Sequence, residues 1–236
     1  MGDPAGVGPE IAIKALGHSV IHKTCRPLIL GSGEVLEKAT NTVGSSAQLL
    51  CIKDLNDACW EPDNINILET GLDKKIDFPC GKVSAIAGEL GFRAIERAIR
   101  LAKQGSVEAT VTGPIHKEAL NMAGHSFAGQ TEIFAHLTKT KDYAMLLIAG
   151  ALRVVHVSTH VSLREACLLV TRERVATVIR LAHEAGSAFG IANPRIAVSG
   201  LNPHASDGGL FGSEDVDEIA PAVRVCLLYT SDAADE

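Results

Sequence analysis

Short apolar runs with the residue preferences of β-strands alternate with stretches of helical periodicity along this 236-residue chain. Strands are predicted at residues 26–31, 48–52, 65–68, 109–112 and 195–199, with a hairpin that joins 143–148 to 153–157. Helices are predicted over 83–103 and 172–190, and from residues 34, 117, 130, 162 and 213 onward. This alternation favours an α/β fold with largely parallel sheets and flanking helices. In such sheets, functional groups gather in loops at the carboxyl ends of the strands.

Composition and net charge indicate which residues form the core and which classes of binding partner are disfavoured. Apolar residues make up 46% of the chain and aromatic residues 4%, so we expect a core of Ala, Val, Leu and Ile. The formal net charge of −6 argues against binding to nucleic acid or to anionic membranes, which needs clustered Lys and Arg. There is no charged, apolar leader and no apolar run of membrane length, so we expect a cytoplasmic protein.

The two ends of the chain depart from the strand and helix pattern. The opening MGDPAGVGPE is a Gly- and Pro-rich turn that leads into a helix near Pro9, and we expect the strand before this turn to be missing. It lacks both the GK[ST] ending of a P-loop and the GxGxxG spacing. Residues 226–236, CLLYTSDAADE, break the helical pattern and are interpreted as a non-native tail. We therefore expect a fragment whose native sequence ends near Val225.

Two histidines follow predicted strands, where parallel sheets concentrate function. His160 ends the run RVVHVSTH, and His204 lies in SGLNPHASDGG, just past residues 195–199. Imidazole suits zinc and neighbouring first-row ions, so the pair is a candidate half of a divalent-metal site. Two ligands leave such a site incomplete, and purely structural roles stay open for both. Asp207 is a candidate acceptor that would fix the tautomer of an imidazole.

Three further polar side chains stand at the starts of predicted helices. Lys117 ends the run TGPIHK, where its ammonium group and nearby backbone N–H groups could hold a phosphate or a carboxylate. Gln130 and Thr131 open the helix of GQTE and could hydrogen-bond a ligand. The alternatives are a solvated lysine at an ordinary helix start, and Thr131 as a simple N-cap.

Together, the motifs GDPAGVGPE, TGPIHKEALNMAG, GQTEIFAHLT, RVVHVSTHVSLREA and GLNPHASDGGLFG resemble the 4-hydroxythreonine-4-phosphate dehydrogenase family in order and spacing. The first motif is also similar to the GDGIGPE loop of isocitrate and isopropylmalate dehydrogenases. The resemblance extends from Met1 to about Val225. It implies an isocitrate/isopropylmalate dehydrogenase-like fold of two α/β domains, which we place at residues 1–122 and 123–225, each incomplete.

The resemblance also implies an activity. Enzymes of this family use NAD or NADP to oxidise the secondary alcohol of a phosphorylated four-carbon acid, whose keto product loses CO₂ on the route to pyridoxal phosphate. They are homodimers with a shared active site and a divalent metal, here Zn, Mg, Mn or Co, held by three histidines. The matching motifs assign two of these ligands to His160 and His204, and we expect the third beyond the end of this fragment. No residue is assigned to the cofactor.

One motif departs from the family pattern, because the family usually has GHTE where this chain has GQTE. The resemblance assigns Gln130 and Thr131 to the substrate, and Lys117 is a candidate anion contact because of its place at a helix start. Gln cannot carry a proton at neutral pH, so the substrate stays open. Phosphates of threonate or erythronate and aromatic dihydrodiols are alternatives to 4-phosphohydroxythreonine. An inactive fragment is the non-enzymatic alternative, and a phosphate acetyl- or butyryltransferase is a weaker one.

Overall fold

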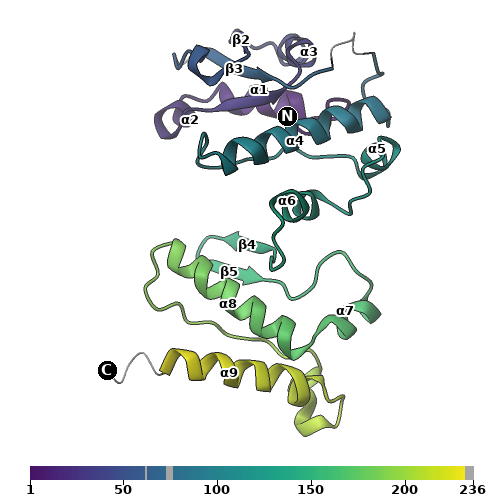
Figure 1. Cartoon of the computed structure of the whole chain (residues 1–236), viewed down its shortest axis with the longest axis vertical. Coiled ribbons are helices and arrows are strands. Elements are labelled where there is room, and N and C mark those ends of the chain that lie inside the picture. The colour runs from purple at the N-terminus through teal and green to yellow at the C-terminus, as the bar shows by residue number, and fades with distance from the viewer. Residues whose placement is uncertain (62, 73–76, 232–236) are drawn as a thin grey trace. The chain divides into compact units, whose positions relative to one another are not determined.

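The computed structural model describes residues 1–61, 63–72 and 77–231 of the chain (Figure 1). It divides into two compact units, Met1–Lys139 and Thr140–Glu236. The predicted division after residue 122 stays a prediction. Of the predicted tail, residues 232–236 lie outside the described residues, and α9 (Ala220–Ser231) contains the rest. No helix in the described part of the chain has the length and apolar character needed to cross a membrane.

The first unit is built on a parallel sheet of three strands, in the order β1-β3-β2. The strands are β1 (Leu28–Gly31), β2 (Gln48–Ile52) and β3 (Asn64–Glu69). Ile29 of β1 pairs with Ile67 of β3, and Leu50 of β2 pairs with Asn66 of β3. These strands confirm the α/β fold with a parallel sheet and the three strand predictions in this region.

Side chains of the central strand alternate between the two faces of the sheet, as the pleat requires. Ile65 and Ile67 are buried against α1 (Gly8–Leu16) and α3 (Gly33–Val43), which contribute Ile13 and Leu36 to the same cluster. On the other face, Leu68 packs with Leu101 of α4 (Ala85–Lys103). Helices therefore cover both faces, which explains why residues 65–68 of β3 are all buried, including the polar Asn66.

The long amphipathic helix α4 also supports the helices that carry the candidate substrate residues. Its residues Ile95 and Ile99 form a buried cluster with Leu120 of α5 (Lys117–Met122) and Ile133 of α6 (Gln130–Thr138). This packing fixes the first turns of α5 and α6 relative to α4. The short helices α2 (Ser19–Thr24) and η1 (Leu55–Asp57) complete the regular elements described in this unit.

The second unit combines a hairpin with helices. The strands β4 (Leu146–Ala149) and β5 (Leu152–Val155) pair antiparallel, as predicted but over fewer residues. The helices are α7 (Leu163–Leu169), α8 (Arg172–Ala188), α9, and the short turns η2 (Pro203–Gly209) and η3 (Asp215–Ile219). Ser162 and Glu165 form the predicted capping box at the start of α7. Val175, Ile219 and Ala222 form the buried core of this unit.

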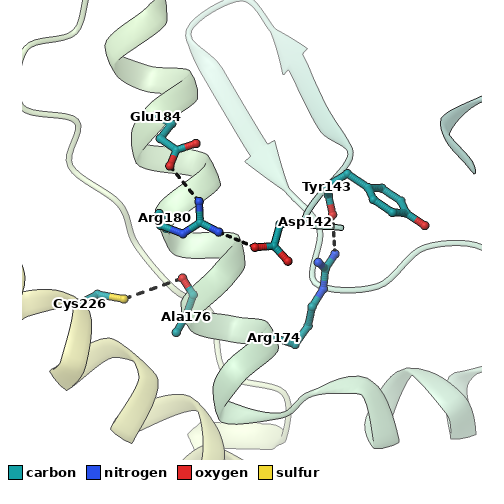
Figure 2. Close-up of polar contacts among 7 residues, drawn as sticks. All are labelled: Asp142, Tyr143, Arg174, Ala176, Arg180, Glu184 and Cys226. Carbon is teal, nitrogen blue, oxygen red and sulfur yellow. Dashed lines mark hydrogen bonds and ion pairs between the residues drawn. The ribbon is translucent and has the colours of Figure 1, made fainter. Parts of the chain in front are cut away.

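Two arginines of α8 tie the helix to the chain beside the hairpin (Figure 2). Arg180 lies between Asp142, with a nitrogen–oxygen distance of 2.8 Å, and Glu184, at 2.9 Å. Arg174 donates to the backbone carbonyl of Tyr143 at 3.0 Å and to that of Val157 at 2.9 Å. These contacts hold the start of β4 and the end of β5 against one face of α8.

Two strand predictions were wrong. Residues 109–112 and 195–199 have apolar, β-branched sequences but form no strand in the structure. Val111 is 96% exposed, and Ile196 and Val198 are 38% and 36% exposed. Strand propensity alone does not make a strand, because the backbone also needs a neighbour that accepts and donates its hydrogen bonds. Neither segment has such a neighbour within the described residues.

Candidate functional site

The opening loop of the first unit lies against the segment that leads to α5. The backbone N–H of Asp3 donates to the carbonyl of Pro114 at 2.8 Å. The buried carboxylate of Asp3 accepts from the N–H of Ala5 at 2.9 Å, which closes the turn. The Gly- and Pro-rich sequence suits this position, because a Cβ on Gly2 would lie 2.5 Å from the Pro114 oxygen, and Gly2 has a φ of +80°.

Gln130 is bound to the same segment. It is the first residue of α6, and its Nε2 donates to the carbonyl oxygen of Gly113 at 2.7 Å. This contact orients the side-chain amide, and Oε1 makes no hydrogen bond with any described residue. Because Nε2 is held by the Gly113 carbonyl, Oε1 of this half-buried amide can accept a hydrogen bond from a ligand O–H or N–H group.

The other two predicted substrate residues of this unit are exposed. Thr131 is the second residue of α6, whose N-cap is Gly129, so the alternative of Thr131 as an N-cap was wrong. Lys117 is the first residue of α5, and the imidazole Nδ1 of His116 accepts from the N–H of Ala119 at 3.4 Å to cap that helix. The cap leaves the ammonium group of Lys117 in solvent, where it is available to an anion.

The two predicted metal ligands belong to the second unit, and both are exposed. His160 lies in the loop between β5 and α7, and His204 lies in η2. Both have left-handed backbone conformations, with φ of 59° and 54°, which are uncommon for residues other than glycine. Neither imidazole makes a hydrogen bond with the residues that the structure describes. Exposed imidazole nitrogens of this kind have the donor chemistry of a zinc or cobalt site.

The donor set is incomplete within the described residues, since no group of three or more His, Cys, Asp or Glu side chains could hold a metal ion there. The His204 ring lies beside Phe211, with a centroid distance of 6.4 Å. Asp207, the candidate acceptor for fixing the tautomer of an imidazole, is exposed, and its carboxylate bonds to no described residue. His160 and His204 have nitrogen donors that suit a metal, and their role as ligands stays a prediction.

The loop that carries His204 is a run of left-handed residues. His204, Ala205, Ser206, Asp207 and Gly208 all have φ between 42° and 69°, on the left-handed side of the backbone map. Left-handed helical backbone costs about 1–2 kcal/mol per L-residue, and consecutive non-glycine examples need compensation from their surroundings.

Asp215 supplies compensation that the sequence analysis missed. Its Oδ1 accepts from the N–H of Leu201 at 2.8 Å. Its Oδ2 accepts from the N–H and the Nδ2 of Asn202, both at 3.0 Å, and from the hydroxyl of Ser206 at 2.6 Å. Ser206 is fully buried, and Asp215 is 6% exposed. The carboxylate therefore joins both ends of the loop segment that contains His204.

These donors stabilise the ionised form of Asp215. The Ser206 hydroxyl, followed by the backbone N–H groups of Leu201 and Asn202 and the Asn202 side chain, lowers the pKa of this carboxyl below its ordinary value of 3.8. In the sequence, the acids of Ser213–Asp215 were taken only as a favourable start to a helix. The contacts of Asp215 with residues 201–206 span 9 to 14 positions and leave no periodic signal.

Other histidines of the first unit have structural contacts. The Nε2 of His125 lies 2.7 Å from the carboxylate of Glu89, and its ring stacks on Phe92 with centroids 3.6 Å apart. His22 contacts the carbonyl of Leu16 at 2.7 Å. Both histidines therefore make structural contacts within the first unit.

Comparison with known proteins identifies relatives along almost the whole chain. Residues 23–227 match the family model described as pyridoxal phosphate biosynthetic protein PdxA. The D-threonate 4-phosphate dehydrogenase of Cupriavidus necator is 42% identical over 225 residues, which are 95% of this chain and 67% of that protein. The crystal structure of 4-hydroxythreonine-4-phosphate dehydrogenase from Klebsiella pneumoniae has a TM-score of 0.87 and 41% identity, covering 98% of this chain and 70% of that one. The Burkholderia phymatum structure of the same title has a TM-score of 0.84 and 40% identity, covering 97% of this chain and 69% of that one.

Proposed function

Because the chain belongs to the PdxA family of pyridoxal phosphate biosynthetic proteins, and is a dehydrogenase of that family, we propose the following reaction. The enzyme oxidises the secondary alcohol of a phosphorylated four-carbon acid and transfers hydride to NAD or NADP. The single observation that carries this proposal is the pair of exposed imidazoles, His160 and His204, each free of hydrogen bonds to the described residues and each in a left-handed loop. Both lie within the matched region.

In this proposal, His160 and His204 hold a divalent metal, and the chemistry of their nitrogens favours Zn or Co over Mg or Mn. A bound metal of this kind acts as a Lewis acid that lowers the pKa of the substrate hydroxyl and favours loss of hydride. The two histidines act as neutral ligands, so neither is assigned a proton-transfer role. The third histidine that the family resemblance implies is not among the described ligands.

The residues of the first unit orient the substrate. Gln130 is held by the Gly113 carbonyl and offers Oε1 as an acceptor to a substrate O–H or N–H group. The exposed hydroxyl of Thr131 offers a second hydrogen bond, and the ammonium of Lys117 offers a positive charge to the substrate phosphate. Because an amide carries no proton at neutral pH, Gln130 binds the substrate without acting as an acid or base.

The erythronate phosphate and dihydrodiol alternatives stay open, and the names of the relatives point to two substrates, which differ at the carbon next to the carboxylate. Threonate 4-phosphate has a hydroxyl there, whereas 4-phosphohydroxythreonine has an ammonium group. The C. necator relative favours D-threonate 4-phosphate, because it is named as a dehydrogenase of that compound. The names of the K. pneumoniae and B. phymatum enzymes favour 4-phosphohydroxythreonine, the precursor on the route to pyridoxal phosphate.

The remaining family features extend this proposal. We propose that the enzyme is a cytoplasmic homodimer with a shared active site and an isocitrate dehydrogenase-like arrangement of two domains. The support is the resemblance of the five motifs and the coverage of 98% of this chain by a solved relative. Analytical ultracentrifugation tests the oligomeric state, and a monomer at micromolar concentration would contradict the dimer.

The decisive experiment measures NADH or NADPH formation with each of the two substrates, before and after treatment with EDTA. We expect turnover that EDTA removes and that added Zn²⁺ or Co²⁺ restores. His160→Ala and His204→Ala should abolish this turnover. His183→Ala is the matched control, because His183 is an exposed histidine on α8 outside both motifs, and it should leave the rate unchanged. Activity that survives EDTA and both ligand substitutions would refute the metal-dependent mechanism.

A further inference from the structure

The loop around His204 has a costly backbone conformation. Four consecutive residues other than glycine, His204 to Asp207, have positive φ, and Gly208 continues the turn. Such a run persists only when surrounding contacts determine it. The contacts that hold it are therefore part of how the loop presents the His204 imidazole.

These contacts converge on one buried carboxylate from a different element. Asp215 is the first residue of η3, yet its side chain turns back to the loop instead of capping its own helix. It accepts four hydrogen bonds, from the N–H of Leu201, the N–H and side chain of Asn202, and the hydroxyl of Ser206, at distances from 2.6 to 3.0 Å. Glu214 adds a bond of 2.8 Å from the Asn202 side chain.

We propose that Asp215 is a positioning residue that preforms the His204 loop for metal binding. The inference rests on the proposed function only in treating His204 as a metal ligand. Asp215 fixes Leu201 and Asn202 before His204 and Ser206 after it, so His204 lies in the middle of a segment pinned on both sides. Without these bonds, the loop would relax toward ordinary backbone conformations, and metal binding would have to restore the strained one.

A carboxylate is needed because every group that faces it is a donor. An amide at position 215 has only one acceptor oxygen, and its NH₂ group would face either the N–H of Leu201 or the three donors at Oδ2. Asp215→Asn therefore keeps the size of the side chain and disrupts the contacts. Asp217→Asn is the matched control, because Asp217 is an exposed acid of the same short helix and its replacement removes the same charge.

The test compares wild type, Asp215→Asn, Asp217→Asn and Ser206→Ala in the full chain. Amide hydrogen exchange across residues 200–210 is measured without metal, and Co²⁺ affinity is measured by calorimetry. Loss of a group that orients a metal ligand typically weakens binding by about 10- to 100-fold. We expect faster exchange and at least about tenfold weaker Co²⁺ binding in Asp215→Asn, a smaller effect of the same sign in Ser206→Ala, and wild-type values in Asp217→Asn.

The outcomes distinguish failure of the anchoring role of Asp215 from failure of the proposed metal site. Unchanged exchange across the loop in both Asp215→Asn and Ser206→Ala would overturn the anchoring role. Faster exchange with unchanged Co²⁺ affinity would overturn the link to metal binding. Equal losses of Co²⁺ affinity in Asp215→Asn and Asp217→Asn would show a general charge effect and also overturn it. A wild-type chain that binds Co²⁺ no better than His204→Ala would refute the proposed metal site, while the exchange data would still decide the anchoring role.

If Asp215→Asn fails to fold, Ser206→Ala supplies the same comparison with a single contact removed.

Discussion

Two glycines of α4 that are one helical turn apart should respond to the same substitution with opposite signs. Gly88 lies where α4 meets α5, and a Cβ there would overlap the carbonyl group of Ala119 and lie 2.8 Å from the backbone nitrogen of Leu120. Gly91 faces the opening loop, where a Cβ would lie 3.4 Å from the Gly2 oxygen, an ordinary contact. The two sites therefore differ in available space.

The expected magnitudes follow from two competing effects. Gly to Ala within a helix gains about 1 kcal/mol from the lower conformational freedom of the unfolded chain. At Gly88, the atoms in the way belong to the backbone of α5 and cannot rotate aside, so the overpacking cost should reach the upper part of the usual range, about 3 kcal/mol. Gly88→Ala should thus lower the free energy of unfolding by about 2 kcal/mol, and Gly91→Ala should raise it by up to about 1 kcal/mol.

Urea denaturation followed by circular dichroism measures both changes. A loss of about 2 kcal/mol should lower the melting temperature by about 4–8 °C in a protein of this size. Substrate turnover provides a second measurement, because α5 carries Lys117 and its displacement should raise KM for the phosphorylated substrate. A Gly88→Ala variant as stable as Gly91→Ala would show that α5 does not pack against α4 as described.

Two further predictions concern the second unit. Ser162→Ala removes the capping box of α7 and should lower the free energy of unfolding by about 1 kcal/mol, measured by urea denaturation, whereas Arg164→Ala on the same exposed helix should have a smaller effect. The pKa of Asp215 is lowered by folding, so its contribution to stability is present above the unfolded value near 3.9 and is lost as the pH falls through the lower folded value. The stability difference between wild type and Asp215→Asn should therefore shrink below about pH 4 in urea titrations, and a constant difference down to pH 2 would contradict this.

Sequence patterns predicted two kinds of element correctly. One kind is stabilised by contacts between residues close in the sequence, and the other by burial of one apolar face. The helical period of residues 83–103 led to α4, and the Ser and Glu spacing led to the capping box of α7. The strands at residues 48–52 and 65–68 were found because their apolar runs are packed between helices. Residues 109–112 and 195–199 also contain β-branched residues, but pairing with another strand is a non-local property that their sequences do not reveal.

The candidate site shows the same division between local and non-local information. The motifs indicated His160, His204 and Gln130, but they did not indicate the left-handed backbone of the histidines or the bond from Gln130 to Gly113. Both features depend on groups that are distant in the sequence. Asp215 was missed for the same reason. The sequence of a helix start is the same whether its acidic side chain interacts with the helix dipole or hydrogen-bonds to a distant loop.

The strand order β1-β3-β2 has a consequence for the assembly of the first unit during synthesis. Leu28 pairs with Asn66, and Gln48 pairs with Asn64, so both outer strands hydrogen-bond to the last of the three to emerge from the ribosome. Until β3 has been synthesised, β1 and β2 have no strand to pair with in this sheet, and their apolar side chains cannot be buried against it. Such long-range closure raises the contact order and slows folding. The nascent chain therefore passes through a stage at which β1 and β2 have unpaired strand edges, a condition that favours aggregation.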